Sequence, residues 1–223
     1  MRGWRNGRRI WSGNMTYIVG LLATDGNLSG DGRHINFTSK DIQLIKTFRK
    51  CLGIKNKIGL KSSGFSEKKY FRIQFSDVIL YRWFLEIGLT PAKTHTIGEL
   101  KIPNQYFFDF IRGHFDGDGS CYSYWDKRWH SSFMFYIHFV SANEKHVVWL
   151  RQKIDELSKI KGHIDTIKRN GVYQLRYAKK DSKVLISKMY HQKNLPHLRR
   201  KHKKLEKIIS TENKENNRKT TNI

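Results

Sequence analysis

Two short segments of the chain resemble each other, and this repetition constrains the fold more than any other feature. The first segment, residues 18–26, reads IVGLLATDG, and the second, residues 111–119, reads IRGHFDGDG. Each combines apolar residues at helical spacing with a final Asp-Gly pair, which is a helix-stop signal. We expect the glycine to supply a left-handed cap. Because the two Asp-Gly pairs occupy matched positions, the sequence predicts two copies of one structural unit.

The stretches that follow the two segments repeat the same order of expected elements. Residues 34–41 and 133–144 alternate between apolar and polar residues and are rich in β-branched and aromatic types, as is typical of strands. A helix, a second hairpin and a closing helix then follow in each half. We therefore predict an α+β fold made of two pseudo-symmetric α-β-β-α-β-β-α repeats with antiparallel sheets.

The two repeats are expected to be joined tightly. Pro91 and Pro103 bracket the junction, and nothing between them resembles a long flexible linker. The C-terminal tail is polar and is predicted to be disordered. The predicted segments are a basic N-terminal arm (1–13), a first repeat (14–102), a second repeat (103–209) and the tail (210–223).

The charge balance indicates a polyanionic partner. The 223 residues include 43 Lys plus Arg and 19 Asp plus Glu, which gives a formal net charge of +24. Nucleic acid is the natural partner for such a surface, because neutralised phosphates release condensed counterions. The two cysteines have no metal-like spacing, which favours free thiols and a reducing intracellular compartment. No apolar run is long enough to span a membrane, and the basic N-terminus lacks the apolar core of a secretory signal.

Polar and basic residues alternate with apolar ones along the expected strands. One face of each sheet would pack on helices, and the other would present groups that suit DNA phosphates and base edges. An ordinary solvated sheet face would show the same alternation, and the net charge favours contact with DNA. The candidate DNA-binding residues are Arg33, Asn36, Ser39, Lys40, Lys61, Arg72, Gln74, Ser141, Lys168, Arg169, Gln174 and Arg176.

Small residues within the repeated segments favour close packing of two helices. Gly20 and Thr24 lie four residues apart in the first segment, and Gly113 and Gly117 do so in the second. Small residues on one helical stripe allow two backbones to approach each other. We therefore expect the two segments to pack together with their Asp-Gly ends converging.

Convergence of these ends would place the carboxylates of Asp25 and Asp118 side by side. Two adjacent carboxylates at helix C-termini repel each other, and divalent cations between them would relieve the repulsion. Such ions beside bound DNA make a phosphodiesterase centre. A single Asp-Gly pair is usually only a helix end, whereas two matched pairs in a strongly basic chain favour this chemistry.

Both segments resemble the motif of the LAGLIDADG homing endonucleases, in the form that carries two motifs in one chain. The resemblance extends from about residue 17 to about residue 209. Ala23 replaces the first aspartate of the motif in the first copy, and Asp116 keeps it in the second. That position is not expected to be catalytic. Arg112 and His114 are polar where the motif is apolar, and we place them away from the helix interface or near its exposed end.

The resemblance implies a monomeric, site-specific endonuclease with two saddle-shaped sheets over a long asymmetric DNA site. It implies that Asp25 and Asp118 bind Mg²⁺, with help from the carbonyl groups of Thr24 and Gly117. Mn²⁺ or Ca²⁺ could occupy the same place. Both strands would be cut across the minor groove to leave 3′ overhangs.

The resemblance also implies supporting residues around the metal. Family members place a lysine after the closing helix of each half, and this nominates Lys93 and Lys201. A water-organising residue lies at the end of the second strand of each half, where this chain has Ser39 and Ser141. These serines are shorter than the glutamine or lysine that the family often has.

Two other functions stay open at this point. An RNA maturase that helps an intron to splice would need the basic surface but not the metal pair, and it would make intron RNA a partner. A non-catalytic DNA-binding regulator could also be built on this fold. Retention of both Asp25 and Asp118 favours the nuclease.

Overall fold

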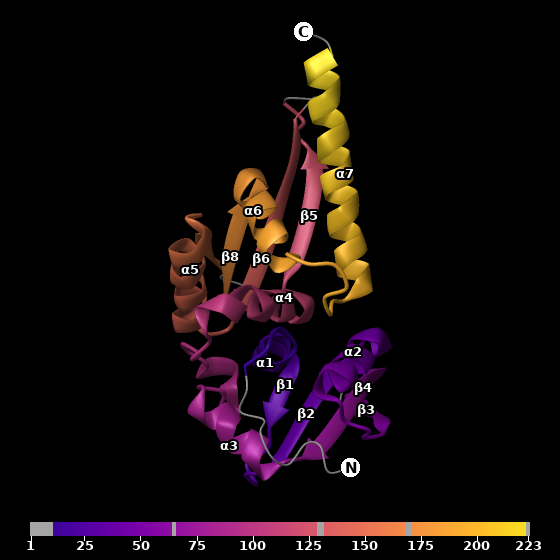
Figure 1. Cartoon of the computed structure of the whole chain (residues 1–223), viewed down its shortest axis with the longest axis vertical. Helices are drawn as coiled ribbons and strands as arrows, with labels where there is room; N and C mark the ends of the chain where they lie inside the picture. The colour runs from indigo at the N-terminus through magenta and orange to yellow at the C-terminus, as the bar shows by residue number, and fades with distance from the viewer. Residues whose placement is uncertain (1–10, 64–65, 129–131, 168–170, 222–223) are drawn as a thin grey trace.

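Two lobes are stacked along the long axis of the molecule, and one motif helix from each lobe lies at the junction (Figure 1). The computed structural model describes residues 11–63, 66–128, 132–167 and 171–221. The first lobe contains α1 (Gly13–Asp25), β1 (Gly26–Leu28), β2 (His34–Ser39), α2 (Ile42–Leu52), β3 (Ile58–Ser63), β4 (Ser66–Ser76) and α3 (Val78–Glu86).

The second lobe repeats this order of elements. A link with two short 3-10 turns, Lys93–His95 and Asn104–Tyr106, joins the lobes. The second lobe then contains α4 (Phe107–Gly117), β5 (Ser120–Trp125), β6 (Phe133–Ser141), α5 (Glu144–Ser158), β7 (His163–Ile167), β8 (Val172–Ala178), α6 (Lys179–Met189) and the final helix α7 (Arg199–Thr221).

The two sheets have the same antiparallel topology. Their strand orders are β1-β2-β4-β3 and β5-β6-β8-β7. In the first sheet Asn36 pairs with Gln74, and in the second His138 pairs with Arg176. The predicted α+β fold with two α-β-β-α-β-β-α repeats is therefore confirmed.

Each sheet buries one face against helices. In the first sheet the buried face carries Ile35, Phe37 and Ile73, and in the second it carries Phe139 and Leu175, all with no exposed surface. The same strands alternate with partly exposed polar residues, so the period of two seen in the sequence matches the pleat. Side-chain caps begin several helices, because Ser12, Asp77 and Asn143 each accept a backbone N–H of the first turn.

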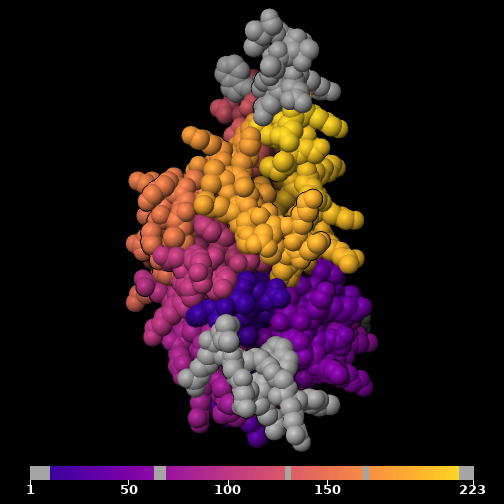
Figure 2. Space-filling model, in the orientation of Figure 1, coloured from indigo at the N-terminus to yellow at the C-terminus, as the bar shows by residue number. Residues whose placement is uncertain are grey.

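The C-terminal segment differs from its prediction. Residues 210–221, expected to be disordered, continue α7, which lies along the flank of the second lobe in Figure 1 and is yellow in Figure 2 except at its grey C-terminal end. Leu205 and Ile208 of this helix are buried, and so is Glu212, which forms an ion pair with Lys179 at 2.5 Å. The polar composition of this segment did not predict a helix, because the helix depends on these contacts with the second lobe. No helix in the part of the chain that the structure describes is long and apolar enough to cross a membrane.

Candidate active site at the junction of the repeats

Helices α1 and α4 pack backbone to backbone at the junction. A Cβ atom added to Gly20 would lie 2.3 Å from the Phe110 carbonyl oxygen, and one added to Gly113 would lie 2.1 Å from that of Tyr17. A Cβ on Gly117 would lie 1.9 Å from the Thr24 hydroxyl. The predicted close approach of the two helices is therefore present, and it depends on the absence of side chains at these glycines.

The glycines that end the two motifs are required for a different reason from the one expected. Gly26 has φ −86° and ψ 159°, which is extended backbone and not a left-handed cap. A Cβ on Gly26 would lie 2.5 Å from Leu22 Cα, and one on Gly119 would lie 2.5 Å from Phe115 Cα. Each glycine lets the chain turn sharply over the last helical turn and enter the first strand of its sheet.

This turn places Asp25 and Asp118 at the two helix ends, where both side chains reach the protein surface. Packed protein atoms remove much of the hydration of the Asp25 carboxylate, and the charge of Asp118 adds to the effect, so its pKa is raised to about 6. Burial also raises the pKa of Asp118. The residues just before the two carboxylates, Thr24 and Gly117, are in contact, so Asp25 and Asp118 lie at neighbouring helix ends.

Two buried lysines cover the ends of the motif helices. Lys93 Nζ donates to the Thr24 carbonyl at 3.2 Å and to the Gly26 carbonyl at 2.5 Å. Lys201 Nζ donates to three carbonyls in the matching place, including that of Gly117 at 2.8 Å. Ammonium groups at helix C-termini satisfy carbonyls that have no partner within the helix.

Burial and the two carboxylates act on these lysines in opposite directions. Burial lowers the pKa of Lys201 to about 8 and also lowers that of Lys93, whereas Asp25 and Asp118 favour the charged form of both. The structure thus brings Asp25, Asp118, Lys93 and Lys201 together in one centre.

The donor set suits a hard divalent cation that keeps several waters. Two carboxylates whose pKa values are raised by their surroundings gain from a neighbouring positive charge. The carbonyls of Thr24 and Gly117, predicted as further ligands, accept hydrogen bonds from Lys93 and Lys201. Among the described residues no group of three or more His, Cys, Asp or Glu side chains that could hold a metal ion is found.

The open face of the first sheet carries the polar residues predicted to meet DNA. Asn36 pairs with Gln74, Lys61 with Tyr70, and Arg72 with both Thr38 and Gly59, so these side chains share the face opposite the buried one. Lys40 stands over the Tyr70 ring at 5.5 Å. Arg33 lies in the loop before β2, with its side chain 61% exposed.

The open face of the second sheet is more aromatic than the sequence indicated. Gln174 and Arg176 lie on it as predicted, and Arg176 is paired with Asp165 at 3.2 Å. Beside them the near-parallel rings of Tyr122 and Tyr136 stack with centroids 5.1 Å apart. Tyr124 continues this row, which the alternation of β5 and β6 could have predicted.

The remaining candidates differ in their surroundings. Ser39 and Ser141 end β2 and β6, and each hydroxyl accepts a backbone N–H two residues later, from Asp41 and Asn143. These serines therefore serve as local turn acceptors. The predicted DNA-binding residues Lys168 and Arg169 lie outside the described residues.

Of the two places expected for Arg112 and His114, an exposed helix end is wrong, and the side chains instead contact the 189–196 segment and α5. Arg112 has no exposed surface, and His114 is 1% exposed. The His114 ring stacks on His146, with their Nε2 atoms 3.2 Å apart. Burial lowers the pKa of both imidazoles, so this pair is neutral at pH 7. Side chains from α5 and from the segment before α7 cover the flanks of α4, which the motif alone does not reveal.

The chain has the fold of the LAGLIDADG homing endonucleases, in the form with two motif-bearing repeats in one chain. Full-length WhiA from Thermatoga maritima superposes with a TM-score of 0.56 at 17% identity, over 91% of this chain and 62% of WhiA. The chain therefore spans less than two thirds of WhiA. An N-terminal domain of WhiA is described as a LAGLIDADG domain.

Two endonucleases are similar to this chain in fold. Mesophilic variants of the homing endonuclease I-DmoI superpose with a TM-score of 0.54 at 17% identity, over 81% of this chain and 96% of theirs. The meganuclease I-SmaMI bound to uncleavable DNA has a TM-score of 0.54 at 15% identity, over 80% of this chain and 84% of its own. No protein-family model and no curated protein matches the sequence. These similarities establish the fold.

Proposed function

We propose that the protein is a site-specific double-strand DNA endonuclease whose centre is formed by Asp25 and Asp118 with divalent metal. The observation that carries the proposal is the meeting of two carboxylates and two buried lysines at the ends of the packed motif helices. The structures of I-DmoI with its target DNA in the presence of Mn or Mg support both the DNA partner and the metal. The predicted 3′ overhangs and Mg²⁺ preference belong to this proposal.

The residues of the centre divide the chemistry between them. Asp25 and Asp118 would hold Mg²⁺, which when bound supplies a water of lowered pKa and stabilises charge on the phosphate. Lys93 and Lys201 hold positive charge next to the carboxylates and keep the helix ends in place through their carbonyl contacts. A DNA phosphate that enters this centre therefore meets fixed positive charge from the chain itself.

The sheets would hold the DNA on either side of the centre. Each motif helix leads directly into the first strand of its own sheet, so the carboxylates lie between the two open faces. Basic and polar side chains there would contact phosphates and base edges. Because the two open faces carry different residues, the DNA site would be asymmetric, and one chain would suffice to bind it.

A cleavage selection tests this proposal. A randomised double-stranded DNA library is incubated with the protein and Mg²⁺, and the cut ends are sequenced to give the site and the overhang. We expect Asp25→Asn and Asp118→Asn to abolish double-strand cleavage, or to leave only a nick, while DNA affinity is largely kept. Wild-type cleavage rates in either variant would show that the assigned chemistry is wrong.

A non-catalytic DNA-binding regulator is the second candidate function. The similarity to WhiA, which covers 91% of this chain, favours it because WhiA is described by its LAGLIDADG domain and not as a nuclease. In that case the selection would yield no cut ends, whereas the same library would enrich a bound sequence without Mg²⁺.

A further inference from the structure

Helix α4 carries a buried polar cluster that α1 lacks. We call the side chains of Asp109, Arg112 and Asp116 the α4 clasp. All three are at most 3% exposed, although each can carry a charge. In the first motif Val19 and Ala23 occupy the places of Arg112 and Asp116, and Asp25 is the only charged residue of α1. Buried charges are unfavourable unless they are paired, so these three side chains are expected to have partners that compensate for their burial.

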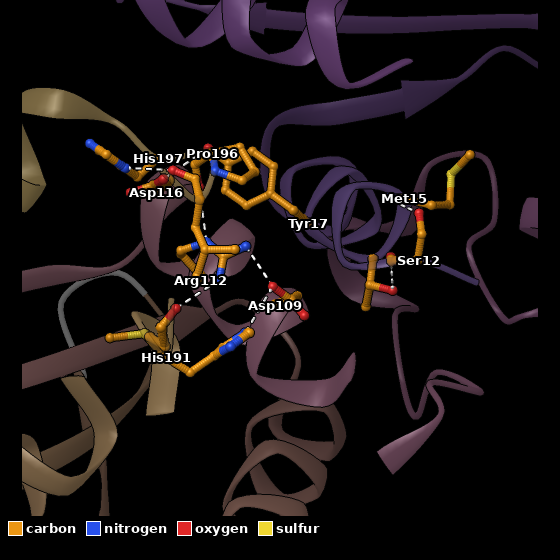
Figure 3. Close-up of polar contacts among 12 residues, drawn as sticks. Ser12, Met15, Tyr17, Asp109, Arg112, Asp116, His191, Pro196 and His197 are labelled. Carbon is orange, nitrogen blue, oxygen red and sulfur yellow. Dashed lines mark hydrogen bonds and ion pairs between the residues drawn. The ribbon is translucent and has the colours of Figure 1, made fainter. Parts of the chain in front are cut away.

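Arg112 connects α4 to the segment that joins α6 to α7. Its guanidinium lies 2.6 Å from Asp109 and donates to the carbonyls of Met189 at 2.7 Å and Pro196 at 2.9 Å (Figure 3). His191, from the same segment, also lies 3.5 Å from Asp109. One fully buried side chain thereby holds both ends of the segment 189–196 on the motif helix.

Asp116 holds the start of α7. Its Oδ2 accepts the Leu198 N–H at 2.7 Å and the Tyr17 hydroxyl at 2.8 Å. The Leu198 carbonyl in turn accepts the N–H of Lys201 at 3.0 Å, so Leu198 begins the helix that carries this lysine. A carboxylate at a helix N-terminus is favourable, which adds to the hold on this residue.

Lys93 reaches its own helix end by another route. It lies in a 3-10 turn that follows Ala92, whose φ is 51°, and Leu89 before it bonds through its N–H to the Phe84 carbonyl at 2.9 Å. This approach uses backbone bonds and apolar packing. The two lysines are therefore placed in matched positions by different means.

We propose that Arg112 and Asp116 are positioning residues that fix the 189–198 segment and, through it, Lys201, so that only one half of the centre depends on the α4 clasp. This inference rests on the proposed endonuclease activity. If each lysine serves the scissile phosphate of its own half, loosening the clasp would slow the cutting of one DNA strand and leave the other nearly unchanged.

Strand-resolved cleavage of the selected DNA site, labelled at either end, tests the inference. Lys201→Met and Lys93→Met first identify the strand that depends on each lysine. Asp116→Leu removes the acceptor for Leu198, and the double variant Asp109→Leu with Arg112→Met removes the ion pair without leaving an unpaired buried charge. We expect both clasp variants to slow the strand of Lys201 by roughly tenfold to a hundredfold, as for a displaced catalytic group.

Conservative variants separate positioning from a general loss of structure. Asp116→Asn keeps an oxygen acceptor for Leu198 and Tyr17, so it should restore most of the strand rate that Asp116→Leu loses. Arg82→Met, at an exposed site of α3, removes one positive charge and should leave the strand ratio unchanged. Equal slowing of both strands by the clasp variants, or slowing of the strand of Lys93, would overturn the inference.

Amide hydrogen exchange gives a readout that needs no cleavage. The N–H groups of Lys201 and His202, which donate to the Leu198 carbonyl, should exchange faster in both clasp variants. Those of Thr96 and Ile97, which donate to the Lys93 carbonyl, should keep their wild-type rates. A wild-type protein that cuts no DNA would contradict the proposed function alone, whereas unchanged exchange at Lys201 and His202 would contradict the clasp.

Discussion

At the scale of single residues, the surroundings of the centre disfavour the charged forms of its ionisable side chains. Asp25 has a pKa of about 6 because surrounding protein atoms and Asp118 disfavour its ionised form. Burial also disfavours the charged form of Lys201, and because this group is a cation its pKa is lowered, to about 8. Groups of this kind are typical of functional sites, where a ligand compensates for the cost that folding incurs.

Asp25→Asn is expected to raise the melting temperature at pH 7 without divalent ions. The pKa of Asp25 is higher in the folded state than its ordinary value of 3.8, so ionisation between pH 4 and pH 6 weakens folding. The gain should shrink as pH falls through 6 and vanish below about 4, where the carboxyl is protonated in both states. Differential scanning fluorimetry over this range measures it.

The same measurement tests metal binding. A cation that binds the folded state alone raises the melting temperature, so Mg²⁺ or Ca²⁺ should stabilise the wild type more than Asp25→Asn at pH 7. An equal shift in both proteins would argue against a metal at Asp25.

Gly20→Ala is expected to separate α1 from α4. Its new Cβ would lie 2.3 Å from the Phe110 carbonyl oxygen, and this backbone atom cannot move aside without shifting the helix. We expect a loss of about 1–3 kcal/mol in the free energy of unfolding, together with loss of cleavage. Gly30→Ala is the control, because nothing lies within 4 Å of its Cβ, and its effect on urea unfolding should stay within about 0.5 kcal/mol.

At the scale of elements, α7 links the centre to the outer flank of the second lobe. Lys201 and Leu205 lie near its start, and Glu212, 2% exposed, pairs with Lys179 and Lys183 of α6 further along. The helix is held both near Lys201 and at Glu212, so the contacts of Glu212 contribute to the position of the segment that carries Lys201.

Glu212→Gln tests this attachment. Loss of the ionic contacts with Lys179 and Lys183 should lower the free energy of unfolding by about 1–3 kcal/mol, as for a hydrogen bond to a charged group. Glu206→Gln removes an exposed carboxylate that pairs only loosely with His202 at 3.5 Å, and it should change stability by less than about 1 kcal/mol. Equal effects of the two variants on urea unfolding would show that the far half of α7 is not held by Glu212.

The sequence predicted the repeated elements well because local patterns specify them. The alternation along β2 and β8 predicts strands with one buried face, and the small residues of the motifs predict close helix packing. The helical tail could not be predicted in this way, because residues 210–215 are polar and the ion-pair partners of Glu212 lie far along the chain, on α6.

The site was predicted where the chemistry lies within the motif, at Asp25 and Asp118. Lys93 and Lys201 were found through resemblance, since nothing in a lysine-rich sequence marks the lysines that turn inward. The burial of Arg112 could not be foreseen, because its acceptors at Met189 and Pro196 lie more than seventy residues away.

At the scale of the whole molecule, the open faces of the two sheets differ in their side chains. The first presents Lys61, Arg72 and Gln74, whereas the second presents stacked tyrosines and an arginine that is already paired with Asp165. Among the described residues, the open face of the first sheet therefore carries the more basic side chains, whereas on the second sheet we expect DNA contact to depend more on hydroxyl and aromatic groups.

DNA affinity is expected to fall steeply with salt, by roughly a thousandfold or more between 50 and 200 mM if about six phosphates are contacted. Lys61→Ala with Arg72→Ala should flatten the slope of affinity against salt, because each removes a phosphate contact. Tyr122→Phe with Tyr136→Phe should lower affinity without changing the slope. Fluorescence anisotropy on the selected site at several salt concentrations measures both, and a nearly flat wild-type dependence would contradict DNA contact through the basic face.

The glycines of the helix junction have a consequence for how such a chain can change over evolutionary time. Gly20, Gly113 and Gly117 meet the opposite helix at distances that exclude any side chain, and Gly26 and Gly119 meet their own helix in the same way. A side chain at any of these five positions would force packed atoms to shift, so substitution there is costly. We therefore expect long divergence to preserve the two nine-residue motifs, and Lys93 and Lys201 of the proposed centre, better than most of the chain.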